Sequence, residues 1–515
     1  MYMSKLTEPV SFCIAGTKRG KLRGVCKEGG YIFRGVKYGN AERFQMAKPV
    51  EPWEGVRDAI VYGYTAPELH PAVAGDQFQQ QHFYTPQNED CQYLNLWTQH
   101  IDPAAKRPVI VLFHGGGWDS GSSVEQFAYD GENMSRFGDI VFVSVEHRLN
   151  CLGSLDLSEF GEKYRDSNYA ALTDAILALE WIQENIEAFG GDPGNVTLIG
   201  HAGGGPQVMT LLNSPMADGL YHKAALGGNV VERFLSPKGI SAKEAARRAA
   251  KLTVQNLGLT ADTLEQIEQI PCAFLLDAAS RAQKQVQEET GTRFRFDPLA
   301  DGVHLVEYSL ENPLPRRNTE IPLLTGGDFG DASSNFRNPI DDNQKDQWSM
   351  EKIHRLLHEM YGESAGCLLE EFEKAYPEKN PADLLFIDRK ARHKNLQVGR
   401  SHAAAGGKVW NWVFALNLPL DGSTVPWHCC DTAYITHNAQ YMEASYLPGV
   451  SDRIQDQLCG AYVAFAANGD PNGPGLPKWN SFTRDSVTTM IFDEEIRAAA
   501  DHDRKLQELM KPWQK

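Results

Sequence analysis

One short segment has the spacing of a catalytic turn but lacks the residue that would perform the chemistry. Gly200-His201-Ala202-Gly203-Gly204 has the glycine pattern of a nucleophile elbow, a sharp turn that lifts a serine hydroxyl above a sheet. Ala202 occupies the serine position. We expect Gly200 and Gly204 to be required as glycines, because a side chain at either position would collide with neighbouring backbone. The chemistry that such a turn serves is acyl transfer through a covalent intermediate.

The elements before this turn predict a parallel sheet that would position it. Apolar runs at 109–113, 140–145 and 196–199 have the composition of buried parallel strands. Between the last two, apolar residues recur every three or four positions over 169–189, which predicts an amphipathic helix. Strand, helix and strand imply a right-handed crossover, and ligands of such sheets bind beyond the carboxyl ends of the strands. The first run leads into the His-Gly-Gly-Gly-Trp segment at 114–118, and the third leads into the alanine turn.

Motifs spread along most of the chain follow the order found in one enzyme family. They are 33–38 with Arg43-Phe44, 89–97, 114–123, 185–197, the turn at Ala202, Asp301-Gly302 and 467–472. Over about residues 20–495 the chain thus resembles the type-B carboxylesterases and cholinesterases. The resemblance implies an α/β-hydrolase fold of the α/β class, with a central, mostly parallel sheet covered by helices and large helical insertions.

The domain organisation is predicted from composition and from the positions of the insertions. Helical patterns fill about residues 240–400, including 242–257 and 350–361, and no Pro/Gly/Ser linker separates them from the rest. We therefore expect one domain over 1–515, with helical excursions packed on a single hydrolase core.

The resemblance assigns the catalytic base to His428 and the catalytic acid to Asp331. Acyl transfer at a serine needs a base that removes its proton and a carboxylate that orients the base. The acid lies within 323–332, where the family has Asp-Glu-Gly, and counting from the first glycine there selects Asp331. Asp328 is the alternative acid. The alternative for His428 is that it merely packs beside Trp427.

Backbone N–H groups are the expected stabilisers of the oxyanion that forms during acyl transfer. By the resemblance these donors belong to Gly116, Gly117 and Gly203, and Gly203 opens a helix whose dipole adds to the effect. A phosphate-binding loop is excluded, because the glycine run lacks the Gly-Lys-Ser/Thr ending. Four residues that flank the catalytic motifs are the predicted substrate-binding residues: Trp118, His201, Phe329 and Trp427. The alternative for the three aromatic residues is that they belong to the core.

Two departures from the family's pattern bear on substrate and location. His201 stands where these esterases have glutamate, which disfavours choline-like substrates. Cys91 should form the family's first disulfide, but no cysteine stands near Pro67 to pair with it. The nine cysteines are scattered without a metal-binding spacing, and no apolar segment has the length of a signal peptide or membrane span. These features predict a cytoplasmic protein of the intracellular microbial type.

Ala202 has two possible explanations. It is either an introduced Ser→Ala change in an active esterase, or a natural loss of catalysis in a relative that keeps the fold for binding. An elbow residue is held at positive φ, which costs an alanine about 1–2 kcal/mol without any chemistry in return. Because His428, Asp331 and the glycine donors are all retained, we favour the introduced change.

The function predicted from these residues is hydrolysis of a carboxylic ester through a Ser-His-Asp triad and an acyl-enzyme. An amidase or carbamate hydrolase would use the same triad. The expected partner is a small-molecule ester, with no cofactor and no membrane, and the sequence does not predict the oligomeric state. The net charge of −17 argues against a nucleic-acid partner. His354 and His358 lie four residues apart on a predicted helix, but no third ligand is spaced to complete a zinc site.

Overall fold

The structure is a computed structural model of the 515-residue chain. The residues that it describes are 11–27, 29–69, 85–228, 230, 236–316, 320–335, 338–340, 344–420, 423–443, 445–483 and 485–514. They divide into two compact units. The first unit holds the described residues of 11–222 and 236–307, and the second holds those of 223–230 and 308–514.

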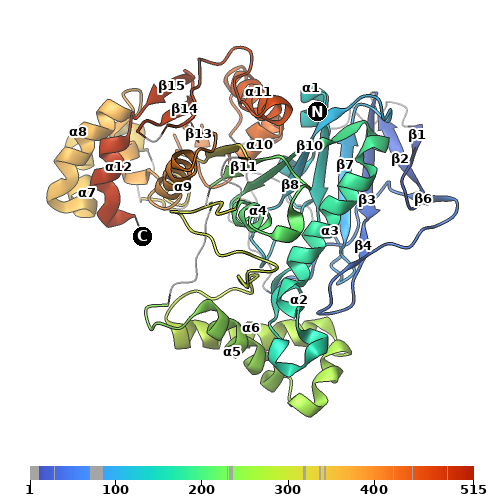
Figure 1. The fold of residues 1–515 in the computed structure, drawn as a ribbon. Coiled ribbons are helices and arrows are strands. Elements are labelled where there is room, and N and C mark those ends of the chain that lie inside the picture. Colours follow the sequence, from blue (N-terminus) through green and yellow to red (C-terminus); the bar gives the residue numbers. More distant parts are fainter. Residues whose placement is uncertain are drawn as a thin grey trace. The chain divides into compact units, whose positions relative to one another are not determined.

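The first unit is built on a sheet in which the three predicted strands are neighbours (Figure 1). Its strands follow the order β1-β2-β3-β7-β9-β8-β10, and β6 pairs with β2. β8 pairs in parallel with β9 and with β10, whereas the pairs from β1 through to β9 are antiparallel. The strands of this unit, including the separate β4–β5 pair, are β1 Ser11–Gly16, β2 Lys21–Lys27, β3 Gly30–Lys37, β4 Gly39–Asn40, β5 Lys48–Pro49, β6 Val56–Asp58, β7 Tyr93–Thr98, β8 Arg107–Phe113, β9 Val141–Val145 and β10 Gly191–His201.

The predicted crossover helix is α3, Ala170–Asn185, which lies between β9 and β10 in the sequence. Its apolar residues Leu172, Ile176, Leu179 and Ile182 are each at most 3% exposed. Burial extends around almost the whole helix, because α2, α4 and the β4–β5 pair also pack against it. The polar face expected of an amphipathic helix is therefore narrow.

Two of the other helices of the first unit pack against each other. α5 and α6 lie side by side (Figure 1) and share an apolar core with the segment around α2. α5 confirms the helix predicted over 242–257, and its Ser241 side chain caps the helix together with Glu244. The helices are α1 Glu132–Gly138, α2 Asn150–Ser154, α4 Gly204–Leu212, α5 Ala242–Asn256 and α6 Cys272–Thr290.

The second unit contains a parallel run of strands with an antiparallel edge. β11, β12, β13 and β14 pair in parallel in that order, and β15 pairs antiparallel with β14. These strands are β11 Lys223–Gly227, β12 Leu323–Gly326, β13 Val409–Phe414, β14 Thr488–Phe492 and β15 Arg497–Ala500. Parallel strands end at the same edge of a sheet, so the segments that follow β12 and β13 emerge next to each other.

The helices of the second unit include α7, which confirms the helix predicted over 350–361. Its residues Ile353, Leu357 and Tyr361 are buried at four-residue steps, whereas His354 and His358 are exposed. The helices are α7 Met350–Tyr361, α8 Ala365–Ala375, α9 Arg392–Ala404, α10 Thr432–Ile435, α11 Val450–Asn468 and α12 Arg504–Met510. In the described part of the chain, no helix has the length and apolar character needed to cross a membrane.

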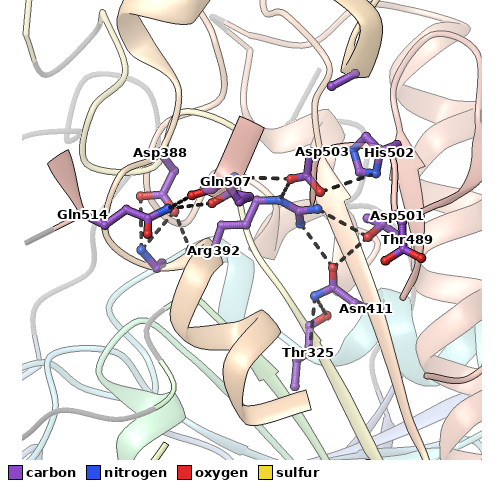
Figure 2. Close-up of polar contacts among 12 residues, drawn as sticks. Thr325, Asp388, Arg392, Asn411, Thr489, Asp501, His502, Asp503, Gln507 and Gln514 are labelled. Carbon is purple, nitrogen blue, oxygen red and sulfur yellow. Dashed lines mark hydrogen bonds and ion pairs between the residues drawn. The ribbon is translucent and has the colours of Figure 1, made fainter. Parts of the chain in front are cut away.

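A buried arginine joins α9 to the strands and to α12 (Figure 2). The Arg392 guanidinium forms an ion pair with Asp503, the residue that precedes α12. Its other nitrogens donate to Asn411 Oδ1 on β13 at 3.2 Å and to Thr489 Oγ1 on β14 at 3.4 Å. Although burial raises the pKa of Asp503, the Arg392 charge holds it well below the usual range. Arg392 therefore joins the start of α9 to the segment before α12 and to β13 and β14.

Removing this arginine should destabilise the second unit strongly. Arg392→Ala would leave the Asp503 carboxylate buried without its cation, which typically costs about 3–5 kcal/mol in the free energy of unfolding. The shift of the urea unfolding midpoint measures this cost. The matched control is Arg400→Ala on the same helix, because Arg400 is partly exposed and contacts Asp501 at 3.7 Å. We expect the control to cost less than about 1 kcal/mol, and equal shifts for the two variants would contradict the assigned role of Arg392.

Candidate active site

The alanine turn has the backbone geometry of a nucleophile elbow. Ala202 lies between β10 and α4 with φ at 53°, in the left-handed region that an alanine rarely adopts. A Cβ added to Gly200 would lie 2.2 Å from the Gly204 carbonyl oxygen. One added to Gly204 would lie 2.3 Å from the carbonyl oxygen of Phe113. Both glycines are therefore required where the sequence predicted them, because backbone atoms occupy the space of a side chain.

The glycine loop after β8 lies against this turn within the first unit. A Cβ on Gly203 would lie 1.9 Å from Gly117 N and 2.6 Å from Gly116 C, so the two backbones are in direct contact. The Gln207 side-chain amide, on α4, donates to the carbonyl of Gly117 and holds the loop there. The three predicted oxyanion donors are thus close together beside Ala202. Their role as donors stays a prediction.

Two stacked histidines support the glycine loop. The rings of His114 and His147 are 5.1 Å apart and nearly parallel, and the Trp118 ring is 5.1 Å from that of His147. Burial lowers the pKa of His114 to about 3, so this imidazole is neutral. Trp118 and the predicted binding residue His201 are both buried. The Trp118 side chain therefore packs against His147, which in turn stacks on His114 of the loop.

In the second unit, the structure brings the predicted acid to the predicted base. Asp331 Oδ2 lies 2.9 Å from Nδ1 of His428, and the two side chains are 6% and 27% exposed. Burial alone would lower the pKa of His428. The Asp331 charge outweighs burial, with a smaller contribution from Cys429, so this pKa is well above its ordinary value. Backbone contacts join the two segments: Asp331 bridges to Trp427, and Gly330 N donates to Pro426 O at 3.1 Å. A carboxylate held in this way orients an imidazole as a general base requires.

Asp328, the alternative acid, contacts the loop after the histidine. Its carboxylate accepts the backbone N–H of Cys429 at 2.9 Å and that of Asp431 at 3.3 Å, and the Cys430 thiol lies at 3.2 Å. Asp328 therefore fixes the path of the loop that carries His428. The carboxylate hydrogen-bonded to the His428 ring is that of Asp331.

The two remaining predicted binding residues are enclosed in the second unit. Phe329 is 2% exposed and packs edge-on against Tyr376, with ring centroids 5.1 Å apart. Trp427 is fully buried next to the acid segment. Both side chains are core residues in this structure, and a part in substrate binding stays a prediction.

One residue near the acid was not predicted from the sequence. The Asp388 carboxylate accepts the backbone N–H groups of Lys390, Ala391 and Arg392 at 2.6–3.2 Å, and Arg392 is the first residue of α9 (Figure 2). Its own N–H donates to the carbonyl oxygen of Phe329 at 2.7 Å. Burial and the nearby Asp331 charge raise the pKa of Asp388. Asp388 stands four residues before α9 and is not in the capping position, so the usual helix-start signal does not single it out. Its closeness to the acid depends on tertiary structure.

The candidate residues thus form two groups. Ala202, Gly116, Gly117 and Gly203 lie in the first unit, whereas Asp331 and His428 lie in the second. Cys91 packs against Ala66 and Leu149 as a free cysteine, in agreement with the absence of a cysteine near Pro67. That the two groups act together as one catalytic triad stays a prediction.

Comparison with known proteins identifies relatives whose sequences align with nearly the whole chain. The model of the carboxylesterase family matches residues 13–509. A solved esterase from Clostridium hathewayi, described as hydrolysing aliphatic aromatic polyesters, is 38% identical with a TM-score of 0.90, covering 98% of this chain and 100% of that one. The para-nitrobenzyl esterase of Bacillus subtilis (strain 168) is 28% identical over 513 residues, covering 97% of this chain and 98% of its own. The phenmedipham hydrolase of Pseudarthrobacter oxydans is 28% identical, covering 94% and 95%. The similar structures confirm the expected α/β-hydrolase fold.

Proposed function

Because the chain belongs to the carboxylesterase family, we propose that its site is that of a carboxylic ester hydrolase with a Ser-His-Asp triad, in which Ala202 replaces the serine. The observation that carries the proposal is the 2.9 Å contact between Asp331 and His428. A buried carboxylate on one ring nitrogen leaves the other nitrogen for proton transfer. The left-handed φ of Ala202 supports the proposal, because the elbow conformation is kept where no hydroxyl uses it.

The proposed reaction follows from the chemistry of these groups once a serine is present. His428 removes the serine proton as the hydroxyl oxygen attacks the ester carbonyl carbon, while Asp331 stabilises the imidazolium. The N–H groups of Gly116, Gly117 and Gly203 stabilise the oxyanion. His428 then gives its proton to the departing alcohol, and water hydrolyses the acyl-enzyme by the same route. With Ala202 in place, the chain would bind esters without turning them over efficiently.

The proposed substrates are esters with aromatic or alkyl groups. The similar esterase from C. hathewayi is described as acting on aliphatic aromatic polyesters, and the B. subtilis relative is named for a para-nitrobenzyl ester. The experiment is to offer the Ala202→Ser variant a para-nitrobenzyl ester, an aliphatic aromatic oligoester, the carbamate phenmedipham and an anilide. We expect ester hydrolysis. Hydrolysis of the carbamate or anilide alone would replace the esterase proposal, and a folded variant that cleaves none of them would indicate a binding protein.

The proposed oxyanion loop gives a further prediction. A Cβ on Gly116 would lie 2.1 Å from the Ser120 carbonyl oxygen, and the φ of 93° is one that alanine rarely adopts. Gly116→Ala in the Ala202→Ser chain should therefore displace the loop and lower kcat by about 10²–10³-fold. The control is Gly366→Ala, because no atom lies within 4 Å of the added Cβ. An unchanged kcat in a folded Gly116→Ala protein would remove this loop from the mechanism.

A further inference from the structure

An arginine lies beside the proposed oxyanion loop, within the first unit. A Cβ added to Gly117 would lie 3.8 Å from Nη1 of Arg295 and 4.0 Å from its Cζ. Apart from the residues next to Gly117 in the chain, no other atom of the described residues lies within 4 Å of that position. The corresponding position at Gly116 is instead filled by the Ser120 carbonyl group. The Arg295 guanidinium therefore borders an open space at the proposed donor Gly117.

The segment that carries Arg295 is anchored to the α5 and α6 helices. Phe294 and Phe296 are at most 3% exposed and belong to the apolar core that contains residues of both helices. The Gln283 side-chain amide, on α6, donates to the Phe294 carbonyl oxygen at 3.1 Å. The Arg295 side chain, between these two phenylalanines, reaches the glycine loop and is 13% exposed. Its charge is therefore carried on an anchored segment and is only partly hydrated.

Asp297 is an anionic group that contacts the same guanidinium. Its Oδ2 lies 3.4 Å from both Nε and Nη2 of Arg295, whereas Nη1 is the nitrogen nearest Gly117. The Asp297 side chain is 37% exposed, so water screens its charge. A guanidinium presents five N–H donors in a planar fork. Arg295 can thus contact Asp297 along one edge and bind a second carboxylate, beside the loop, along another.

We propose that Arg295 selects esters whose acyl group carries a second carboxylate, which are half-esters of dicarboxylic acids. The proposal rests on the proposed function, which places the reacting carbonyl oxygen at the N–H groups of Gly116, Gly117 and Gly203. The substrate carboxylate accepts hydrogen bonds from the guanidinium beside this position. Because the acyl group stays bound until the acyl-enzyme is hydrolysed, the contact acts in both steps of the reaction. Hydrolysis of one ester bond of a diester leaves a molecule of this class.

Binding to the chain with Ala202 retained tests the proposal without turnover. Isothermal titration calorimetry compares monomethyl terephthalate with its neutral counterpart, methyl 4-carbamoylbenzoate. Hydrogen bonds between a partly buried guanidinium and a carboxylate should make the charged ligand bind about 10- to 100-fold more tightly. A half-ester that binds no more tightly than the neutral ligand overturns the proposal. The isomer O-benzoylglycolate carries its carboxylate on the alcohol group, and tighter binding of this isomer than of monomethyl terephthalate overturns the assignment to the acyl group.

Variants of two arginines separate a direct contact from a general effect of charge. Arg295→Gln should weaken binding of monomethyl terephthalate by about 10- to 100-fold and leave binding of the neutral ligand nearly unchanged. Arg295→Lys should keep part of the affinity, because the charge remains without the planar fork. The matched control is Arg293→Gln, which removes the same charge from an exposed side chain two residues away. Equal weakening of both ligands in Arg295→Gln, or an equal effect of Arg293→Gln, overturns the proposal.

Kinetics of the Ala202→Ser chain distinguish failure of this proposal from failure of the proposed function. A chain that hydrolyses both methyl esters equally well, with no change in Arg295→Gln, is an esterase in which Arg295 does not select the substrate. An Ala202→Ser chain that folds and cleaves no ester contradicts the proposed function instead. In that case the calorimetry still decides whether Arg295 binds a carboxylate, because it needs no turnover.

Discussion

Ala202→Ser should raise the turnover of a susceptible ester by about 10⁶-fold, because loss of a triad nucleophile typically costs that much. The rest of the proposed machinery is already positioned: Ala202 has the elbow conformation, and Asp331 contacts His428. The measurement compares kcat for the two chains on the same ester. When deacylation is slow, the variant should also release a burst of alcohol equal to the enzyme concentration, as expected of an acyl-enzyme.

The control for this gain is the double variant Ala202→Ser with His428→Gln. It has the hydroxyl but lacks the base, so its rate should fall back close to that of the original chain. A contaminating esterase would give activity in both preparations. If the single variant folds, binds esters and still lacks turnover, adding the serine hydroxyl does not restore catalysis. That result would indicate a natural binding protein.

Asp331→Asn in the Ala202→Ser chain should lower kcat by about 10⁴-fold, whereas Asp328→Asn should have a much smaller effect. An asparagine in place of a triad acid stabilises the wrong imidazole tautomer and cannot stabilise the imidazolium. Asp328 accepts hydrogen bonds from Cys429 N and Asp431 N, so its loss would loosen the loop and leave the His428 contact in place. Comparable losses from the two variants would contradict the assignment of Asp331.

The pH profile of the Ala202→Ser chain provides an independent reading of the same pair. The base must be neutral to accept a proton, and the Asp331 charge raises the pKa of His428 despite its burial. Activity should therefore rise with pH through a midpoint above the ordinary histidine value. Asp331→Asn removes the main charge that favours the imidazolium, so the midpoint of its residual activity should move to lower pH. A midpoint that does not move would indicate that Asp331 does not control the titration.

Local patterns in the sequence were sufficient for the elements that lead to the site. The apolar runs at 109–113, 140–145 and 196–199 correspond to β8, β9 and β10. Side-chain periodicity and turn chemistry are set by neighbouring residues, so they can be read without a fold. The glycine requirement at 200 and 204 was predictable for the same reason, because it follows from the geometry of a single turn.

The sequence by itself also determined the family and the residue types of the site, but tertiary structure decided which side chains meet. Asp331 and His428 are 97 residues apart, and they come together because β12 and β13 are adjacent parallel strands whose following segments emerge at one edge. That pairing brings Asp331 to the imidazole and Asp328 to the backbone of the next loop. Asp388 lies close to the acid because its N–H donates to Phe329 O. Residue spacing cannot specify such contacts, because they depend on which strands are neighbours and on where each loop turns.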